Sequence, residues 1–280
     1  MIKPMLAFHY NPSRITFPCF VQPKLNGVRG IYDPRSPHFQ SRQGERWTNA
    51  VVNHALSALT KLGNVFLDGE FYRHGFSLQE INSRISVVRS GVHAESTLIQ
   101  FHVFDVIVRV PFRKRAEIMR WLGQSLEGNE YVQFVETHEI FTPIEAEHWY
   151  NQWKNIHGFE GMMYRDAEAH YGLESQCGNK ENRWWCLQKR KECLDMDATI
   201  TDLIAMVDSK TKGDKDTLGA FELRADNGAL FTAGSGLTMQ QRYDYWHNPE
   251  RVMGKRVHIE YEMLSDTGIP LKPIIACVHE

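Results

Sequence analysis

Apolar residues follow one another along the first two thirds of the chain in two different spacings. Residues 64–73 (NVFLDGEFYR) and 98–108 (LIQFHVFDVIV) are largely apolar runs of strand length, which predicts buried strands. Residues 51–62 carry apolar side chains at helical spacing, and the glycine that follows them is a common helix terminator. A second helix is expected to begin at Thr142, which opens a capping-box sequence, and to end near Gly158. This part of the chain therefore predicts mixed helices and strands.

Beyond Lys191 the pattern changes to short strands separated by turn residues. An Asp-Asn-Gly sequence at 226–228 is typical of a hairpin turn, and one helix is expected over 238–246. About five short strands with a single helix fit a small β-barrel of the OB type. The sequence therefore predicts an α+β fold in which a larger domain, residues 1–192, precedes a barrel, residues 193–280. The expected strands of the barrel are 197–207, 218–225, 229–236 and 255–264.

The overall composition narrows the class of protein only slightly. The 280 residues are 42% hydrophobic and 24% charged, which is typical of a folded globular protein. With 32 basic and 34 acidic residues the formal charge is −2, so the chain lacks the overall basic character of many nucleic-acid binders. Binding to nucleic acid would then depend on local patches, for which the clusters 113–115 and 189–191 are candidates. A solvated charged face is the alternative interpretation of either cluster.

Several classes of protein are disfavoured by what the sequence does not contain. No apolar run is long enough to span a membrane, and the first residues lack the apolar core of a signal peptide. We therefore expect a cytoplasmic protein, in the host cytoplasm if it is phage-encoded. The five cysteines include no Cys-x-x-Cys pair, so neither a zinc finger nor a disulfide framework is indicated.

The first candidate for chemistry is the sequence PKLNGVRG at 23–30. Gly27 allows the backbone to turn tightly beside Lys24. Lys24 could then point into a pocket, while Arg29 faces phosphate or ribose oxygens. Taken alone, this motif is equally consistent with a turn at the surface.

The second candidate is LDGEFY at 67–72. On a strand, Asp68 and Glu70 share one face because side chains alternate with a period of two. Two carboxylates on an apolar strand are costly unless they meet a metal, ribose hydroxyls or cations. A solvent-exposed face of an edge strand is the alternative interpretation.

Two further motifs lie close to the proposed domain boundary. Glu160 opens EGMMYR and places a carboxylate on an apolar strand after a glycine-marked turn. Residues 184–191 (WWCLQKRK) would, as a strand, place two lysines on the same face as apolar side chains. Two lysines are unusual in an apolar core, but they are suitable ligands for a phosphate bound inside a pocket. That face would consist of Trp185, Leu187, Lys189 and Lys191.

In this order, the motifs resemble the covalent nucleotidyltransferase superfamily, and most closely the compact phage and viral ATP-dependent DNA ligases. The resemblance implies an adenylation domain of antiparallel sheets with flanking helices, followed by an OB-fold domain. It assigns Lys24 as the adenylylated lysine, with Arg29 as its companion. It also assigns Glu70 to the ribose, Phe104 to stacking on adenine, and Glu160 to the metal and phosphate site.

The resemblance extends to residues outside these motifs. Lys189 and Lys191 match lysines around the α-phosphate, and Gln22 lies where the family reads adenine. Arg42 matches an arginine that contacts DNA at the nick. The sequence that begins at Asp197 looks like the family's entry into its OB domain. Further basic candidates for the site are Arg165, Arg183, Lys272 and His279.

Two positions depart from the family pattern. Asn26 stands where the motif usually has aspartate, so one negative charge near the metals and the 3′ end of the nick is missing. The C-terminal motif usually carries arginine or lysine to orient the departing pyrophosphate, whereas this chain has Lys272 and, where arginine is common, His279. The aspartate-to-asparagine departure predicts weakened rather than lost sealing, and the C-terminal departure predicts a less efficient reaction with ATP in the first step.

The resemblance implies a DNA ligase that uses ATP and magnesium or manganese, with Glu160 and Glu70 as metal-binding residues. Lys24 would form a lysyl-AMP intermediate, AMP would pass to the 5′-phosphate of a nick, and the 3′-hydroxyl would displace it. The expected partner is nicked duplex DNA, to which Asn26 and Arg42 are the candidate contacts. No obligate protein partner and no membrane are expected, and the chain is expected to act as a monomer.

Other functions remain open on the sequence. An RNA ligase or an mRNA-capping guanylyltransferase of the same superfamily would use the same kind of lysine. A nick-binding protein with weakened catalysis is a second alternative, and Asn26 and His279 are its motivation. A P-loop ATPase is excluded because the chain contains no Gly-x-x-x-x-Gly-Lys-Ser/Thr sequence.

Overall fold

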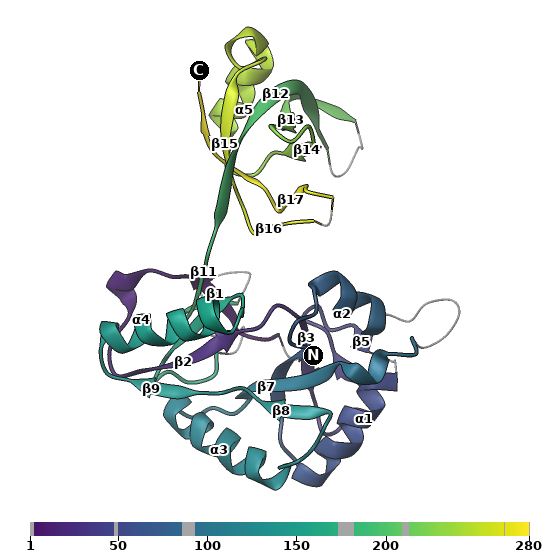
Figure 1. The fold of residues 1–280 in the computed structure, drawn as a ribbon, viewed down its shortest axis with the longest axis vertical. Helices are drawn as coiled ribbons and strands as arrows, with labels where there is room; N and C mark the ends of the chain where they lie inside the picture. The colour runs from purple at the N-terminus through teal and green to yellow at the C-terminus, as the bar shows by residue number, and fades with distance from the viewer. Residues whose placement is uncertain are drawn as a thin grey trace. The chain divides into compact units, whose positions relative to one another are not determined.

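A computed structural model of the chain divides into two compact units, residues 1–191 and 192–280 (Figure 1). The structure describes residues 3–47, 50–85, 93–172, 182–208, 213–265 and 267–279. None of the helices in these ranges has both the length and the apolar content needed to cross a membrane.

The first sheet of the larger unit has five strands in the order β1-β11-β10-β2-β9. Its two central pairs, β11 with β10 and β10 with β2, are antiparallel, and β1 pairs with β11 in parallel. This sheet carries the lysine motif at the end of one strand and the lysine pair at the end of another. The strands are β1 Leu6–His9, β2 Cys19–Lys24, β9 His138–Ile140, β10 Gly161–Asp166 and β11 Arg183–Lys191.

The second sheet has six strands in the order β5-β4-β3-β6-β7-β8. The LDGEFY motif forms β6, which lies between β3 and β7, so the edge-strand interpretation of this motif is wrong. The strands are β3 Val28–Tyr32, β4 Phe39–Gln40, β5 Arg46–Trp47, β6 Leu67–Tyr72, β7 Gln100–Val106 and β8 Val132–Phe134.

Helices cover one side of each sheet in the larger unit (Figure 1). Apolar residues of α1 and α3 join the aromatic core of the six-stranded sheet, in which Phe39, Phe71 and Phe101 are at most 1% exposed. Trp153 packs on the five-stranded sheet and is 1% exposed. The helices are α1 Ala50–Leu59, α2 Leu78–Ile85, α3 Phe112–Ser125, α4 Pro143–Asn151, the π-helix Gln152–Ile156 and the short 3₁₀ turns Pro12–Arg14, Thr60–Leu62 and Ser96–Leu98.

The helix ends agree with the sequence signals. The first helix continues as a 3₁₀ turn and ends at Gly63, whose φ of 73° is a conformation that glycine adopts without strain. The hydroxyl of Thr142 accepts a hydrogen bond from the Glu145 N–H at 3.2 Å, as the capping-box sequence predicted. The Glu145 carboxylate accepts from the Phe141 N–H rather than from the Thr142 N–H, so the reciprocal bond of a full capping box is not formed.

The smaller unit contains a five-stranded sheet in the order β14-β13-β12-β15-β18, together with the pair β16-β17 and helix α5 (Figure 1). It has its own apolar core, in which Phe221, Val257 and Ile259 are fully buried. The α+β fold with a terminal OB-type unit is thereby confirmed. The elements are β12 Leu194–Val207, β13 Asp214–Ala225, β14 Leu230–Ala233, α5 Met239–His247, the 3₁₀ turn Pro249–Arg251, β15 Arg256–Tyr261, β16 Met263–Leu264, β17 Pro270–Leu271 and β18 Ile274–Val278.

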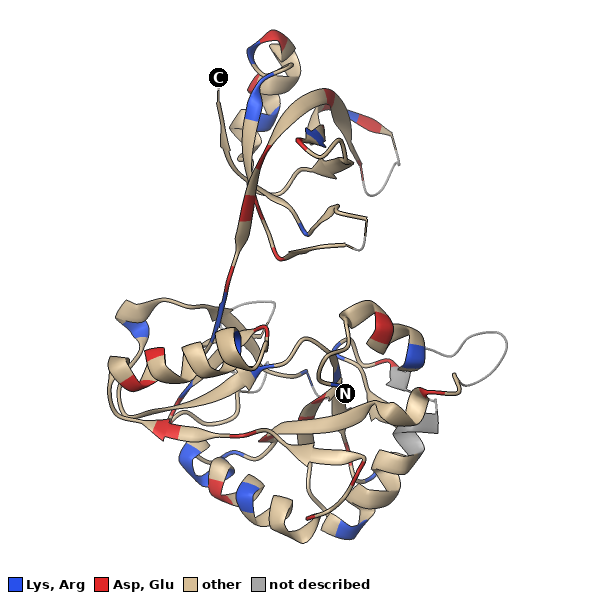
Figure 2. Ribbon diagram, in the orientation of Figure 1, with Lys and Arg blue, Asp and Glu red and all other residues tan. Residues whose placement is uncertain are grey.

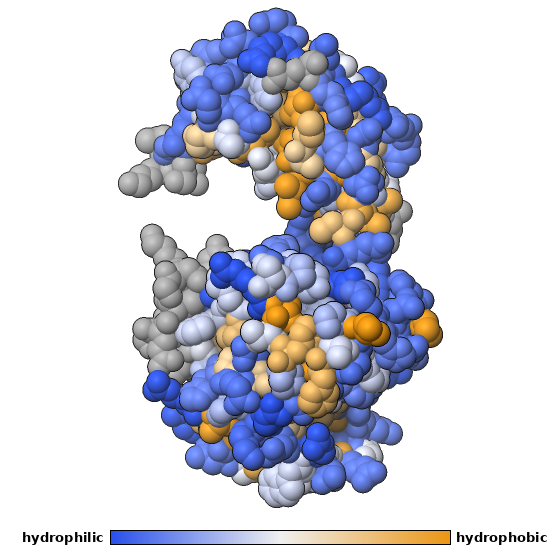
Figure 3. All heavy atoms as spheres, turned by 90° about the vertical axis from the view of Figure 1, so that its left-hand side faces the viewer, coloured by the Kyte–Doolittle hydropathy of each residue, from blue (hydrophilic) through white to orange (hydrophobic). Residues whose placement is uncertain are grey.

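On the face drawn in Figure 3, most surface residues are hydrophilic, and each unit shows a group of apolar residues near its middle. Positive and negative charges are interspersed along α3 (Figure 2). Lys114 pairs with Glu117 at 3.0 Å, Arg113 pairs with Glu139 and Glu168, and Arg115 is buried. The cluster 113–115 is therefore paired with acidic side chains and does not form the basic patch that the sequence allowed.

Candidate active site

Lys24 is the last residue of β2 and lies opposite Gly161 of β10. Its ammonium group is hydrogen-bonded to the carboxylate of Glu160 and also donates to the Leu25 carbonyl at 3.3 Å. Lys191 at the end of β11 brings its Nζ within 3.4 Å of the other oxygen of Glu160. Two lysines therefore share one carboxylate, because the paired ends of three neighbouring strands bring them together.

Glu70 is held against the turn that follows the lysine. The backbone N–H of Gly27 donates to Glu70 Oε1 at 2.9 Å. A Cβ at Gly27 would lie 2.3 Å from the Phe71 carbonyl oxygen, so only glycine fits here. Burial raises the pKa of Glu70 above its ordinary value, and the positive charge of Lys24 opposes that shift.

Arg29 and Asp68 form a bidentate pair from adjacent strands, β3 and β6. Arg29 Nε donates to Asp68 Oδ1 at 2.8 Å, Nη2 donates to Asp68 Oδ2, and Nη1 donates to the Met5 carbonyl at 2.8 Å. Asp68 also accepts from the Tyr171 hydroxyl at 2.7 Å. The buried carboxylate of Asp68 thus meets a cation, Arg29, whereas the carboxylate of Glu70 accepts from the backbone N–H of Gly27.

Gln22, two residues before Lys24 on β2, links the two sheets of the larger unit through its side-chain hydrogen bonds. Its amide nitrogen donates to the Phe104 carbonyl at 3.0 Å and to the Thr137 hydroxyl at 2.9 Å, and its amide oxygen accepts from Arg165 Nε at 2.6 Å. The side chain is 1% exposed and fully engaged, so reading adenine through this amide would require these bonds to break. Phe104 is half-buried on β7, with the guanidinium carbons of Arg29 and Arg165 over its ring at 5.3 Å and 5.5 Å. The adenine contacts of Gln22 and Phe104 remain predictions.

A second buried ion cluster lies next to Gln22, because Arg165 contacts both Gln22 and Asp105. Asp105 accepts from Arg115 Nε at 2.7 Å and from Arg165 Nη1 at 2.6 Å. The three side chains are at most 5% exposed. Burial lowers the pKa of Arg165 from its ordinary value. Asp105 was not singled out from the sequence, and Arg115 was considered only as part of a basic patch, because no motif distinguishes a buried ion pair from a surface one.

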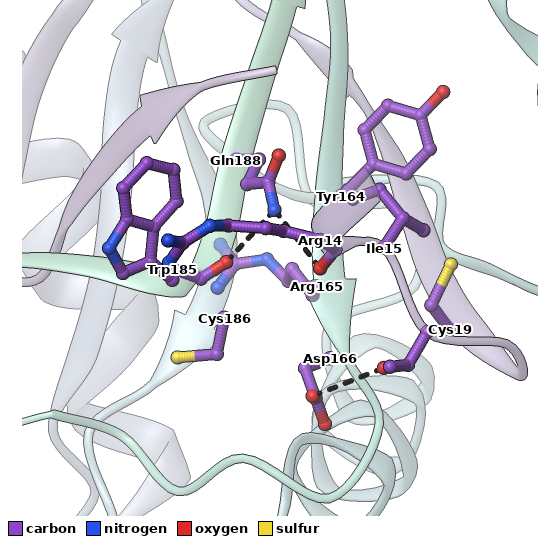
Figure 4. A pocket seen from close by; sticks show the side chains of 10 residues that line it. Arg14, Ile15, Cys19, Tyr164, Arg165, Asp166, Trp185, Cys186 and Gln188 are labelled. Atoms are coloured by element: carbon purple, nitrogen blue, oxygen red, sulfur yellow. Dashed lines mark hydrogen bonds between the residues drawn. The ribbon is translucent and has the colours of Figure 1, made fainter. Parts of the chain in front are cut away.

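The alternation expected along β11 is wrong at Trp185, whereas the pairing with β10 keeps an unbroken register from Leu187 to Lys191. Leu187 is 5% exposed and lies in a buried cluster, whereas Trp185 is 42% exposed and stacks on Phe8 with ring centroids 3.8 Å apart. Trp185 also lines a pocket together with Gln188, three residues further on (Figure 4). The register of β11 against β1 jumps from Trp184 to Gln188, and such an irregularity redirects side chains.

The remaining candidates fall into two groups. In the larger unit, Arg42 lies exposed beyond β4, Asn26 is half-buried between β2 and β3, and Arg183 donates to the Ala7 carbonyl at 2.8 Å. Lys189 is half-buried opposite Met163. Two candidates belong to the smaller unit, where Lys272 pairs with Glu262 at 2.6 Å and His279 is exposed after β18.

His102 lies opposite Glu70 on the neighbouring strand. Burial lowers its pKa to about 4 from an ordinary value of 6.5, and the charges of Arg73 and His74 act in the same direction. Because the unfolded chain takes up a proton first, the free energy of unfolding should fall as the pH drops from about 6.5 to about 4, by up to about 1.4 kcal/mol per pH unit. Urea unfolding at pH 7 and pH 5 measures this slope.

The His102→Gln variant should have a shallower pH slope than the wild type, and His157→Gln, which alters an exposed histidine, should match the wild type. Equal slopes for all three proteins would mean that the acid sensitivity has another origin.

Family models match both units. The larger unit matches the ATP-dependent DNA ligase domain over residues 4–187, and the smaller unit matches the DNA ligase OB-like domain over residues 212–278. The chain belongs to the ATP-dependent DNA ligase family. It is therefore an ATP-using ligase, which confirms the resemblance and favours a DNA ligase over the RNA ligase and guanylyltransferase alternatives.

Solved ligase structures share the fold. A Lig E DNA ligase is 20% identical, with a TM-score of 0.78 and complete coverage of both chains. The Chlorella virus DNA ligase-adenylate is 26% identical, with a TM-score of 0.53 and 99% coverage of each chain. The bacteriophage T7 ligase in complex with ATP is 15% identical, with a TM-score of 0.53, and the match covers 99% of this chain and 98% of that one. Comparison with curated protein sequences gave no match.

Proposed function

We propose that this protein seals nicks with a 5′-phosphate and a 3′-hydroxyl in duplex DNA, with Lys24 as the covalent carrier of AMP. The observation that carries the proposal is the convergence of separate motifs on one site. Lys24 and Lys191 share Glu160, while Glu70 contacts the turn that links Lys24 to β3. Lys24 and Glu160 are 136 positions apart in the sequence, so their meeting is a property of the fold.

In the first step, Lys24 Nζ attacks the α-phosphorus of ATP. A nitrogen–phosphorus bond forms, the bond from the α-phosphorus to the bridging oxygen breaks, and pyrophosphate leaves. Only the neutral amine of Lys24 can attack, so its ammonium group, which is hydrogen-bonded to Glu160, must first lose a proton. Lys191, whose Nζ lies 3.4 Å from Glu160, and Lys189 on the same strand would stabilise negative charge on the α-phosphate.

In the second step, AMP passes from Lys24 to the 5′-phosphate at the nick. In the third step, the 3′-hydroxyl attacks that phosphate and AMP leaves. Arg42 is exposed on the larger unit and is our candidate for a contact with the DNA backbone. Asn26, next to the lysine turn, is our candidate for a contact near the 3′ end.

The site is suited to magnesium that arrives with the nucleotide. The described residues contain no group of three or more histidines, cysteines and carboxylates able to hold a metal ion. Magnesium is commonly held by one or two carboxylates and by substrate phosphates, and Glu160, 20% exposed, and Glu70 supply such carboxylates. When bound, the ion would neutralise charge on the phosphate oxygens.

A gel assay on a 5′-phosphorylated nicked duplex tests the proposal. With magnesium and ATP the labelled strand is expected to lengthen, and with NAD in place of ATP it is expected to remain unsealed. A matched duplex without the 5′-phosphate serves as the control, because step two has no acceptor there. Failure to seal with ATP, while the protein still binds the nick, would favour the nick-binding alternative based on Asn26 and His279.

A further inference from the structure

Tyr171 belongs to no motif, yet it lies at the end of the ion pair that holds Arg29. The residue is 2% exposed. Its hydroxyl donates to Asp68 Oδ2 at 2.7 Å and accepts from the backbone N–H of Met5 at 3.4 Å. Burial, followed by the charge of Asp68, raises the pKa of Tyr171 well above its ordinary value, so the hydroxyl remains a donor.

Four residues close a ring of hydrogen bonds around the guanidinium. Asp68 accepts from Nε and Nη2 of Arg29, and the Met5 carbonyl accepts from Nη1. The amide of the same Met5 donates to Tyr171, which in turn donates to Asp68. A guanidinium has five N–H groups, so two are left over from the bonds that the structure describes and can meet phosphate or ribose oxygens.

The plane of the Asp68 carboxylate sets the plane of Arg29, since the two groups pair through two parallel bonds. Asp68 Oδ2 is the oxygen that both Arg29 Nη2 and Tyr171 contact. Without the tyrosine hydroxyl, the carboxylate would lose a donor, other than Arg29, that restrains its rotation. The carboxylate is 1% exposed, so no bulk water can replace this donor.

We propose that Tyr171 is a positioning residue for the ligase reaction. Its hydroxyl holds Asp68, and through Asp68 it holds Arg29, in the orientation in which Arg29 contacts the nucleotide. This inference rests on the proposed function of Lys24 and Arg29. It also makes the N-terminal segment a part of the site, because Met5 contributes both a donor and an acceptor to the ring.

The Tyr171→Phe variant tests the inference because it removes one oxygen and keeps the ring. The rate of AMP transfer from labelled ATP to the protein, at saturating ATP, is expected to fall roughly tenfold, which corresponds to the loss of about one hydrogen bond to a charged group. Tyr32→Phe is the matched control, since Tyr32 is also 2% exposed and lies in the core of the same unit. Its rate should equal that of the wild type at a similar melting temperature.

A double-mutant cycle separates positioning from general loss of stability. In the Arg29→Ala background, Tyr171→Phe should cause no further loss of rate, because the group that it positions is gone. Asp68→Asn gives the same test through the intermediate residue and covers the case in which Tyr171→Phe does not fold. It should slow transfer at least as much as Tyr171→Phe.

The inference is overturned if Tyr171→Phe labels at the wild-type rate, or if its effect multiplies with that of Arg29→Ala. For Asp68→Asn, transfer at the wild-type rate would overturn it equally. A wild-type protein that takes no label from ATP would instead contradict the proposed function, so the two failures are distinguishable.

Discussion

The Lys24→Ala variant is expected to take up no label from ATP, a complete loss rather than a reduction. The amine of Lys24 is the group that would carry AMP, and neither Lys191 nor Lys189 occupies its place at the end of β2. Incubation with ATP labelled at the α-phosphate, followed by a denaturing gel, measures the covalent adduct. Lys61→Ala is the control, because Lys61 is an exposed lysine of the same unit.

A second substrate separates loss of the nucleophile from loss of the fold. Nicked DNA that already carries AMP on its 5′-phosphate needs only the third step, in which Lys24 forms no bond. We expect Lys24→Ala to seal this substrate. If Lys24→Ala and the wild type label equally with ATP, another residue carries the AMP and the mechanism is wrong.

The Asp105→Asn variant is expected to destabilise the larger unit by about 3–5 kcal/mol. Asp105 is the shared counter-ion of Arg115 and Arg165, and its side chain is 1% exposed. An amide in its place would leave two buried guanidinium groups without an anion, which costs far more than the loss of a surface pair. Urea unfolding followed by tryptophan fluorescence gives the change in the free energy of unfolding.

Asp33→Asn provides the comparison for this experiment. Asp33 is 11% exposed and also pairs with an arginine, but the side chain of Arg35 is 70% exposed. The guanidinium of Arg35 therefore stays in water when its partner loses its charge, and a pair with such a solvated member contributes on the order of 1 kcal/mol or less, so this variant should remain close to the wild type. Similar losses for the two variants would show that burial of the Asp105 cluster is not the cause.

The elements around the lysine could be predicted because their signals are local. The apolar runs at 64–73 and 98–108 predicted β6 and β7, and Gly63 marked the end of the first helix. The motif residues Lys24 and Glu160 could be assigned to one site because the order of motifs resembles that of a family. Their contact follows from strand pairing, which no short pattern in the sequence reveals.

The supporting residues could not be predicted, since what distinguishes them is burial. Tyr171 is one tyrosine among ten in the sequence, and its hydroxyl becomes informative only when Asp68 is found beside it. Asp105 and Arg115 lie ten positions apart and look like ordinary surface charges until the fold encloses them. The irregularity in β11 was missed for a related reason, because pairing with β1 decides it and the alternation within 184–191 does not.

The sharing of Glu160 by Lys24 and Lys191 has a consequence for the timing of the reaction. In the proposed mechanism, one carboxylate contacts both the amine that attacks ATP and a lysine that would bind the α-phosphate. A cation or substrate that attracts the carboxylate of Glu160 would weaken its contacts with both lysines at once. In this mechanism, substrate binding would make Lys24 available for attack and Lys191 available for phosphate binding at the same time. Until the substrate binds, both lysines remain in contact with Glu160.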